Sequence, residues 1–191
     1  MALFNNCDAY PMNKDLTNHL GWLGVNYRRK EYPKYQNCDF SNGGFVILRN
    51  KDAAVIFRYP MFRFRPSHAD ALHLDLWNKG YNLLNDAGSY SYNSIPDFSE
   101  YFSGSKGHNT VEFDGRDQMP KISRFLFGNW LSVENIKLIA FSKDFVSFSA
   151  SYTDYKKAQH IRTIYLGQKK LVVIDNLKGF KQKAVLRWRL K

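Results

Sequence analysis

Residues 65–77 of this chain read RPSHADALHLDLW, and the spacing of their leucines indicates the fold class. Leucines recur at every second position from residue 72 to residue 76, with polar or aromatic side chains between them. This period of two predicts a β-strand over residues 71–77 that buries one face. The triplet Asn78-Lys79-Gly80 indicates a tight turn, and residues 81–86 form the returning strand of a predicted hairpin. The centre of the sequence therefore predicts an antiparallel sheet.

The same period of two recurs through the rest of the chain. It predicts further strands at residues 44–49, 54–65, 108–114, 130–140, 145–152, 160–166, 171–175 and 184–190. Short runs of glycine, asparagine, aspartate and lysine separate these strands. Many short strands punctuated in this way predict an all-β fold, an antiparallel β-sandwich. Residues 87–107 are rich in glycine, serine, asparagine and tyrosine, and we expect them to form one long functional loop.

The sequence changes character at about residue 43. Residues 1–43 show no firm periodicity and predict an irregular linker or docking segment, whereas residues 44–191 predict the β-sandwich domain. The start lacks the charged region and apolar stretch of a secretory signal peptide. We expect the periplasm or cell envelope if a longer parent chain carries a signal peptide, and the cytoplasm otherwise. The last predicted strand runs almost to the end of the sequence, which favours a fragment of a longer chain.

The net charge of the chain indicates which kinds of molecule it can bind. The formal net charge is +11, which attracts polyanions such as acidic polysaccharide or nucleic acid, although a basic surface can also serve solubility. The basic residues form short scattered clusters, and no zinc-finger, RNA-recognition or helix-turn-helix pattern accompanies them, so we expect no nucleic-acid partner. No apolar run reaches 18 residues, so we expect no transmembrane helix.

Three potential metal ligands stand near the ends of predicted strands. His68 precedes one strand, Asp86 ends the next, and His108 begins a third. Strand ends can converge on one rim of a sheet, and two imidazoles with one carboxylate are a suitable set for Zn²⁺. In the alternative interpretation, a histidine and an aspartate near a turn only cap backbone groups.

The order of these motifs resembles the heparinase II/III-like family. The chain carries H-A-D-A-L-H-L from His68, L-x-D-x-G-x-Y-x-Y from Leu84, and Y-F-x-G-x-x-x-H-N-T-V-x-x-D-G-x-x-Q from Tyr101, and the resemblance covers roughly residues 43–191. In that family an N-terminal α/α toroid packs against a C-terminal antiparallel β-sandwich. These enzymes cleave uronate-containing polysaccharides by β-elimination.

The resemblance implies a metal and two partners. It assigns zinc to His68, Asp86 and His108, acidic polysaccharide as the substrate, and a toroid of the parent chain as the second half of the active site. Many family members carry H-x-H-x-D, but here Pro66 stands at the first position and can neither accept a proton nor donate a hydrogen bond. The toroid is absent from this sequence, so we expect the isolated chain to be inactive.

Two other functions stay open. The version of the motif in this chain is similar to family members associated with bacterial surface-polysaccharide synthesis. Because Pro66 replaces a catalytic position, the second hypothesis is a non-catalytic module that only binds glycan or assembles with a synthesis complex. In a third interpretation, the loop after Asp86 closes on the toroid and the metal is a structural staple.

Further candidates surround the predicted metal ligands. Tyr101 and Tyr92 are candidates for proton transfer, with packing as the alternative. Arg116 and Gln118 are candidates for binding the substrate carboxylate, with Arg65 and Arg124 as alternatives. Asp70 is a candidate to orient the His68 ring, with a solvated strand-edge residue as the alternative. We expect His73 on the sheet surface. We expect Asn109 to bond backbone groups.

Overall fold

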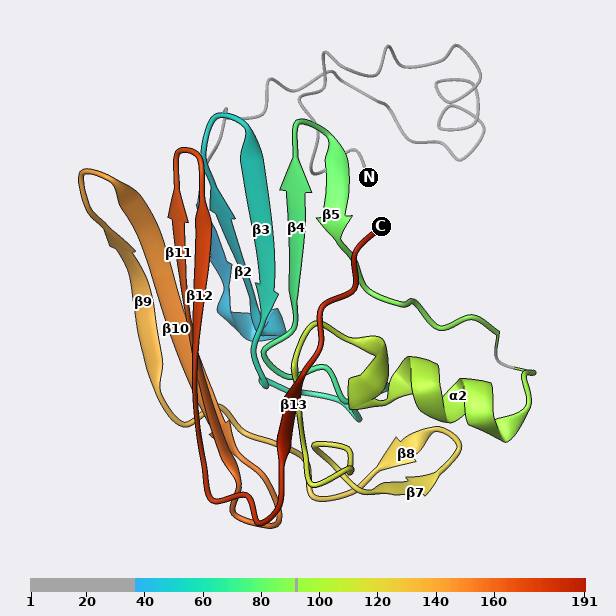
Figure 1. Cartoon of the computed structure of the whole chain (residues 1–191). Helices are drawn as coiled ribbons and strands as arrows, with labels where there is room; N and C mark the ends of the chain where they lie inside the picture. Colours follow the sequence, from blue (N-terminus) through green and yellow to red (C-terminus); the bar gives the residue numbers. More distant parts are fainter. Residues whose placement is uncertain (1–36, 92) are drawn as a thin grey trace, which may run out of the picture. The chain divides into compact units, whose positions relative to one another are not determined.

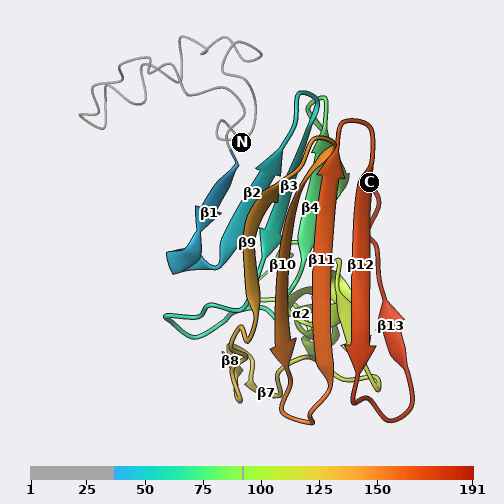
Figure 2. The same ribbon diagram turned by 90° about the vertical axis from the view of Figure 1, so that its left-hand side faces the viewer.

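Two antiparallel sheets face each other in the computed structural model, which describes residues 37–91 and 93–191 (Figures 1 and 2). The first sheet has the order β1-β2-β3-β4-β5 and the second the order β12-β11-β10-β9. The first consists of β1 Cys38–Phe40, β2 Phe45–Arg49, β3 Ala53–Arg58, β4 Leu74–Asn78 and β5 Tyr81–Leu84, and the second of β9 Ile136–Phe141, β10 Phe145–Thr153, β11 Gln159–Gly167 and β12 Leu171–Lys178. The predicted all-β fold, an antiparallel β-sandwich, is confirmed.

The hydrophobic core lies between the inner faces of the sheets. Burial alternates along β2 and β11, as the period of two in the sequence predicts. Phe148 of β10 is 1% exposed and packs its ring against Phe57 and Tyr59 of the opposite side, with ring centroids 5.6 Å apart in both pairs. These aromatic contacts join the two sheets into one core.

The hairpin of β4 and β5 is present, and its turn lies where the sequence predicts it. Lys79 and Gly80 both have positive φ angles, of 48° and 83°, as tight hairpin turns require. The strand β4 begins only at Leu74, three residues later than predicted. Leu72 has a φ of 59°, and this left-handed residue turns the chain before the strand can start.

The stretch predicted as one long loop contains a helix, α2 Pro96–Ser103, followed by the short 3-10 helix η3 Ser105–Gly107. The prediction of an unbroken loop over residues 87–107 is therefore wrong. Pro96 occupies the first turn, where its missing N–H costs nothing, and Asp97 suits the positive helix N-terminus. Both are helix-start signals, but the surrounding serines and asparagines are more typical of loops.

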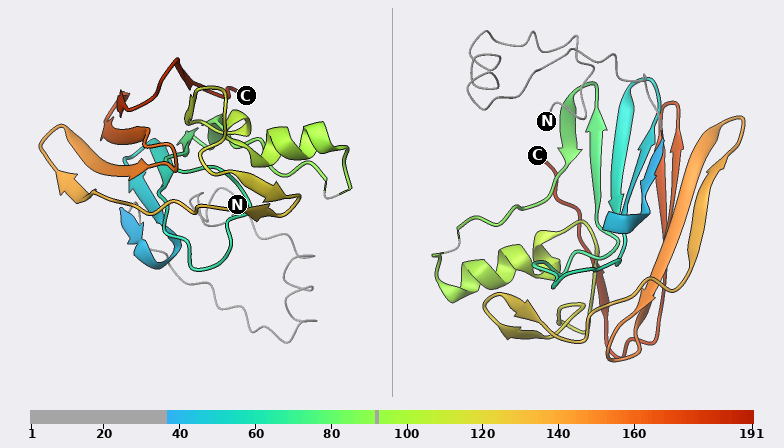
Figure 3. Two further views of the ribbon diagram at one scale, coloured as in Figure 1. Left: turned by 90° about the horizontal axis from the view of Figure 1, so that it is seen from below. Right: turned by 180° about the vertical axis from the view of Figure 1, so that it is seen from behind.

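The remaining elements gather at one end of the sandwich (Figures 1 and 3). They are the pair β6 Val111–Phe113 and β13 Ala184–Leu186, the small hairpin β7 Lys121–Ser123 with β8 Leu126–Phe127, and the helices α2 and η3; η2 Ser41–Gly43 follows β1. The pairing of β6 with β13 brings the last residues of the chain beside the segment that carries His108. Among the described residues, no helix has the length and hydrophobicity that a membrane span requires.

The core contact of Phe148 yields a test of the fold. The change Phe148→Ala leaves a cavity between the sheets, and we expect it to lower the free energy of unfolding by about 3–5 kcal/mol. Phe141→Ala is the matched control, because Phe141 is 72% exposed, and we expect it to cost less than about 0.5 kcal/mol. Urea denaturation measures both. Equal losses in the two variants would contradict this packing.

Candidate metal centre

His68, Asp86 and His108 come together in space. One ligand atom from each residue can be chosen so that all three lie within 4.8 Å of one another. His108 Nε2 is 3.1 Å from His68 Nδ1 and 3.1 Å from Asp86 Oδ2. Neighbouring ligand atoms in a tetrahedral zinc site lie about 3.3 Å apart, as zinc–nitrogen bonds of about 2.0–2.1 Å dictate. Two of the three separations are therefore close to those around one small cation.

Each of the three candidate ligands comes from a different connection at one end of the sandwich. His68 lies between β3 and β4, Asp86 lies two residues beyond β5, and His108 directly follows η3. Ala69 N donates to Ser103 O (2.8 Å), and Ala87 N donates to Gly107 O (3.2 Å). The loops that carry His68 and Asp86 are thus each tied to the α2–η3 segment that leads to His108.

The tautomer of His108 leaves its Nε2 atom available for a metal. Its Nδ1 is 2.7 Å from the carbonyl oxygen of Gly104, which can only accept, so Nδ1 carries the proton. Neutral His108 then presents a lone pair at Nε2 toward the Asp86 carboxylate and the His68 ring. A carbonyl partner on the other ring nitrogen is the usual support of a metal-bound histidine.

The electrostatics also favour a cation among these three side chains. Burial lowers the pKa of His68, and the nearby His108 lowers it further, so that this imidazole stays neutral. Burial alone would lower the pKa of His108, but the hydrogen bond to Asp86 and the charges of Asp70 and Asp86 raise it. Burial opposes ionisation of Asp86, yet the contact with His108 holds its pKa far below the usual range. A proton on His108 offsets the charge of Asp86 but makes no bond to the lone pairs of His68. A divalent cation could accept lone pairs from all three side chains.

His73 packs against His108 and lies near Asp86. Its Nδ1 accepts a hydrogen bond from Asn109 N (2.9 Å), so Nε2 carries the proton and points toward Asp75 Oδ1 (3.2 Å) and Asp86 Oδ2 (3.9 Å). Its ring meets that of His108 edge-on, with centroids 5.5 Å apart. His73 is buried, so its predicted place on the sheet surface is wrong. The leucine alternation indicates which face it occupies but not that a loop covers that face.

Asn109 binds backbone groups from several distant segments. Its side-chain nitrogen donates to Leu74 O (2.9 Å) and Asn85 O (3.3 Å), and its side-chain oxygen accepts from Arg189 N (2.6 Å). Its own carbonyl accepts from Arg162 Nη1 (2.6 Å). The predicted backbone-bonding role of Asn109 is confirmed. These bonds fix the backbone directly beside His108.

Two more side chains touch the rim of the cluster or lie near it. Ser89 Oγ is 3.2 Å from His68 Nε2, a contact that the sequence analysis missed because a serine in a serine-rich loop carries no distinctive signal. Asp70 is buried and pairs with Arg58, whose Nε is 3.1 Å from Asp70 Oδ1. Burial lowers the pKa of the His68 imidazole, and Asp70 acts against this larger effect through its charge, which raises that pKa. Asp70 is not the solvated edge residue of the alternative prediction, and its contact is with Arg58.

Of the two tyrosine candidates for proton transfer, the structure describes Tyr101. Tyr101 belongs to α2, is partly exposed, and accepts a hydrogen bond from Arg189 Nη1 (2.8 Å). Tyr90 stacks on Phe102 with ring centroids 5.3 Å apart and an interplanar angle of 11°. Tyr92 lies outside the described residues.

The predicted substrate-binding residues have structural partners. Arg116 forms an ion pair with Asp154 and lies over the ring of Tyr155. Gln118 is buried, and its amide bonds Ala71 N, Ala71 O and Thr110 Oγ1. The alternatives differ: Arg124 donates to Ser94 O, and Arg65 is exposed. Contact of any of these residues with substrate stays a prediction.

Comparison with known proteins bears on the family. Residues 33–191 match the family described as heparinase II/III-like, C-terminal. The chain is 21% identical to the solved structure of heparinase III, the BT4657 gene product, with a TM-score of 0.67 over 83% of this chain and 25% of that one. It is 19% identical to heparan sulfate lyase HepC from Pedobacter heparinus, with a TM-score of 0.65 over 97% of this chain and 28% of that one. No curated protein matches the chain.

These structural likenesses show a shared fold, and the chain spans about a quarter of the length of the solved structures it matches. The family match covers the segments that carry all three clustered side chains, from His68 to His108.

The donor set predicts zinc binding that depends on His68. Purified protein should hold about one zinc ion per chain, since a three-residue set with one open position is sufficient for tight binding. We expect His68→Ala to lose the metal and Ser67→Ala, a change of the exposed neighbour, to retain it. Mass spectrometric metal analysis of the three proteins measures this. Equal zinc in His68→Ala and the other two proteins would contradict the assignment.

Zinc affinity should rise with pH between about pH 6 and pH 8, because only neutral imidazoles bind the metal. The raised pKa of His108 keeps its ring protonated to higher pH than an ordinary histidine, so zinc must displace that proton in the lower part of this window. The lowered pKa of His68 makes its ring available throughout. Calorimetry in buffers of different ionisation enthalpy counts the released protons. Affinity that does not vary across the window would refute this account of His108.

Proposed function

The chain belongs to the heparinase II/III-like family, as its C-terminal domain, and we propose that it is the sheet domain of a zinc-containing lyase that acts on acidic, uronate-containing polysaccharide by β-elimination. The observation that carries this proposal is the convergence of His68, Asp86 and His108 at one end of the sandwich. The resemblance assigns a metal to these positions. His108 Nε2 lies 3.1 Å from a possible ligand atom of each of the other two residues, and Gly104 O holds the opposite ring nitrogen of His108.

The proposed reaction removes the C5 proton of a uronate and breaks the bond from C4 to the glycosidic oxygen. The electron pair of the C5–H bond forms the C4=C5 double bond, and the departing oxygen takes up a proton. Zinc bound at the centre supplies positive charge that offsets the uronate carboxylate and so acidifies the C5 proton. Tyr101, partly exposed on α2, offers a hydroxyl for proton transfer.

Tyr101 is oriented by its partner. Arg189 donates a hydrogen bond to its hydroxyl oxygen, and the guanidinium carbon lies 5.9 Å from the centre of its ring. The contact fixes the ring relative to the C-terminal segment.

The chain carries only part of the proposed chemistry. Pro66 is buried and stands where many family members have a histidine, so no side chain at that position can transfer a proton. The solved relatives are about four times as long as the matched region. We propose that an α/α toroid of a parent chain supplies the remaining catalytic groups and one wall of the substrate cleft.

Pro66 also favours a second candidate function. A domain that retains the metal ligands but lacks a proton-transfer residue can serve as a non-catalytic glycan-binding or assembly module, for example in bacterial surface-polysaccharide metabolism. In that case the parent chain binds acidic polymer but releases no unsaturated uronate. Ultraviolet absorbance measures this product and so distinguishes the two functions.

Binding by this chain tests the part of the proposal that it carries. The zinc-loaded chain should bind a polyuronate such as alginate about tenfold more tightly than His68→Ala, because the variant lacks the charge of the metal. Ser67→Ala should bind like the unchanged protein. Titration calorimetry at one fixed ionic strength measures the affinities. Equal affinity of all three proteins would exclude a role for the centre in substrate binding.

A further inference from the structure

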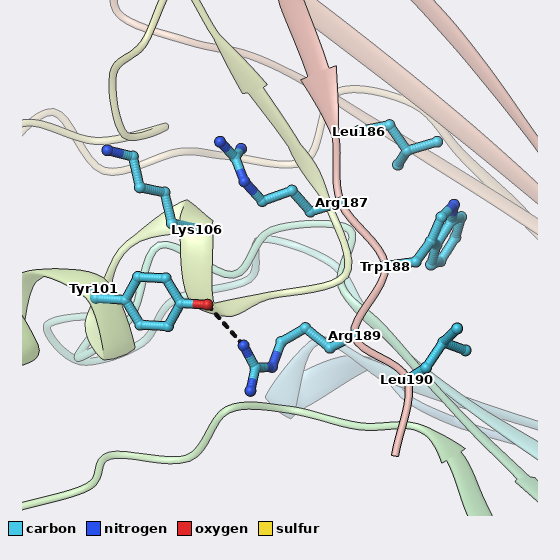
Figure 4. Close-up of a pocket in the computed structure, with 7 residues that line it drawn as sticks. All are labelled: Tyr101, Lys106, Leu186, Arg187, Trp188, Arg189 and Leu190. Atoms are coloured by element: carbon cyan, nitrogen blue, oxygen red, sulfur yellow. Dashed lines mark hydrogen bonds between the residues drawn. The ribbon is translucent and has the colours of Figure 1, made fainter.

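A pocket opens between the helical segment α2–η3 and the C-terminal residues 186–190 (Figure 4). Its volume is about 490 Å³. Tyr101 and Lys106 line one side of it, and Arg187 and Arg189 line the other. The pocket lies outside the three clustered metal ligands, and none of these four residues is among them.

Charged and apolar side chains alternate along the C-terminal segment and lie on opposite sides of it. In Figure 4, the side chains of Arg187 and Arg189 extend toward the side where Lys106 and Tyr101 lie, whereas those of Leu186, Trp188 and Leu190 extend away from it. This is the two-residue period of an extended chain. It places three cationic groups and a phenol hydroxyl around one side of the pocket.

The positive charge of this pocket is only partly compensated. Arg187 pairs with the buried carboxylate of Glu112. No carboxylate lines the pocket itself, and in the described part of the chain Lys106 has neither an ion-pair nor a hydrogen-bond partner. Arg189 donates to Tyr101, while its Nε is buried without an acceptor. The pocket thus presents the charges of Lys106 and Arg189 with no lining carboxylate to balance them, which favours an anionic ligand.

Backbone hydrogen bonds hold the pocket at a fixed place relative to the metal centre. Arg189 N donates to Asn109 Oδ1 (2.6 Å), and Asn85 N donates to Arg189 O (3.2 Å). Asn109 directly follows His108, and Asn85 directly precedes Asp86. The guanidinium of Arg189 therefore stands on an extended segment beyond β13, and this segment is bonded to the neighbours of two of the three proposed ligands.

We propose that this pocket binds an anionic substituent, a carboxylate or a sulfate ester, on a sugar residue next to the one at the metal centre. Guanidinium groups form paired hydrogen bonds with either oxyanion, and the Lys106 ammonium adds a mobile point charge. This subsite rests on the proposed function, because it takes a second residue of the same acidic polymer. It makes the charge pattern of the polysaccharide a determinant of specificity.

The test compares charge-removing variants on two kinds of polymer. Lys106→Gln and Arg189→Gln each remove one positive charge from the pocket, and Lys143→Gln removes one from the exposed β9–β10 turn as the matched control. The probes are alginate with carboxylates only, dextran sulfate with sulfate esters only, and uncharged dextran. Titration calorimetry at one ionic strength gives the affinities, and metal analysis checks that each variant keeps its zinc.

We expect each pocket variant to bind the charged polymers about tenfold more weakly, and the control to change affinity by less than about twofold. A larger loss on alginate assigns a carboxylate to the subsite, and a larger loss on dextran sulfate assigns a sulfate ester. Pocket variants that bind like Lys143→Gln would overturn the subsite and leave the metal-centred function standing. An unchanged protein that binds dextran as tightly as the charged polymers, or binds no polymer, would overturn both.

Discussion

The buried asparagine next to His108 is the constraint on which the rest of the site depends. The Asn109 side chain bonds the backbones of Leu74, Asn85 and Arg189, which come from three separate parts of the sequence. Removing such a group would leave several buried polar atoms without partners, at a cost of about 1–3 kcal/mol for each. Asn109 thus bonds both a neighbour of Asp86 in the proposed metal centre and Arg189 of the pocket beside α2. These bonds fix the distance between the two proposed binding sites.

A buried arginine of the second sheet also holds Asn109 in place. Arg162 of β11 is paired with Asp175 of β12 and donates to the carbonyl oxygens of Asn109 and Leu72, both at 2.6 Å. A buried charge is costly unless its partners are complete, and here most of its donors are engaged. Leu72 has the left-handed backbone that starts the turn into β4. The inner face of the sandwich therefore anchors the loops that carry the site, in addition to forming the core.

Sequence reasoning was most accurate where local pattern decides structure. The period of two located most strands of both sheets, and the order of histidine and aspartate motifs singled out the three residues that the fold brings together. It failed where contacts between distant segments decide. The bond from Arg189 to Asn109 spans 80 residues, and alternation states which face a side chain occupies but not which segment crosses that face. The helix α2 was missed because its two start signals stand within a loop-like composition.

X-ray absorption at the zinc edge of the metal-loaded protein tests whether His68, Asp86 and His108 hold zinc. We expect about four nitrogen or oxygen neighbours at about 2.0–2.1 Å, with the outer-shell scattering of two imidazole rings. A shell of six oxygens without imidazole scattering would show that the metal is bound elsewhere on the surface. The convergence of the three side chains would then be a hydrogen-bonded support for the loops at this end of the sandwich.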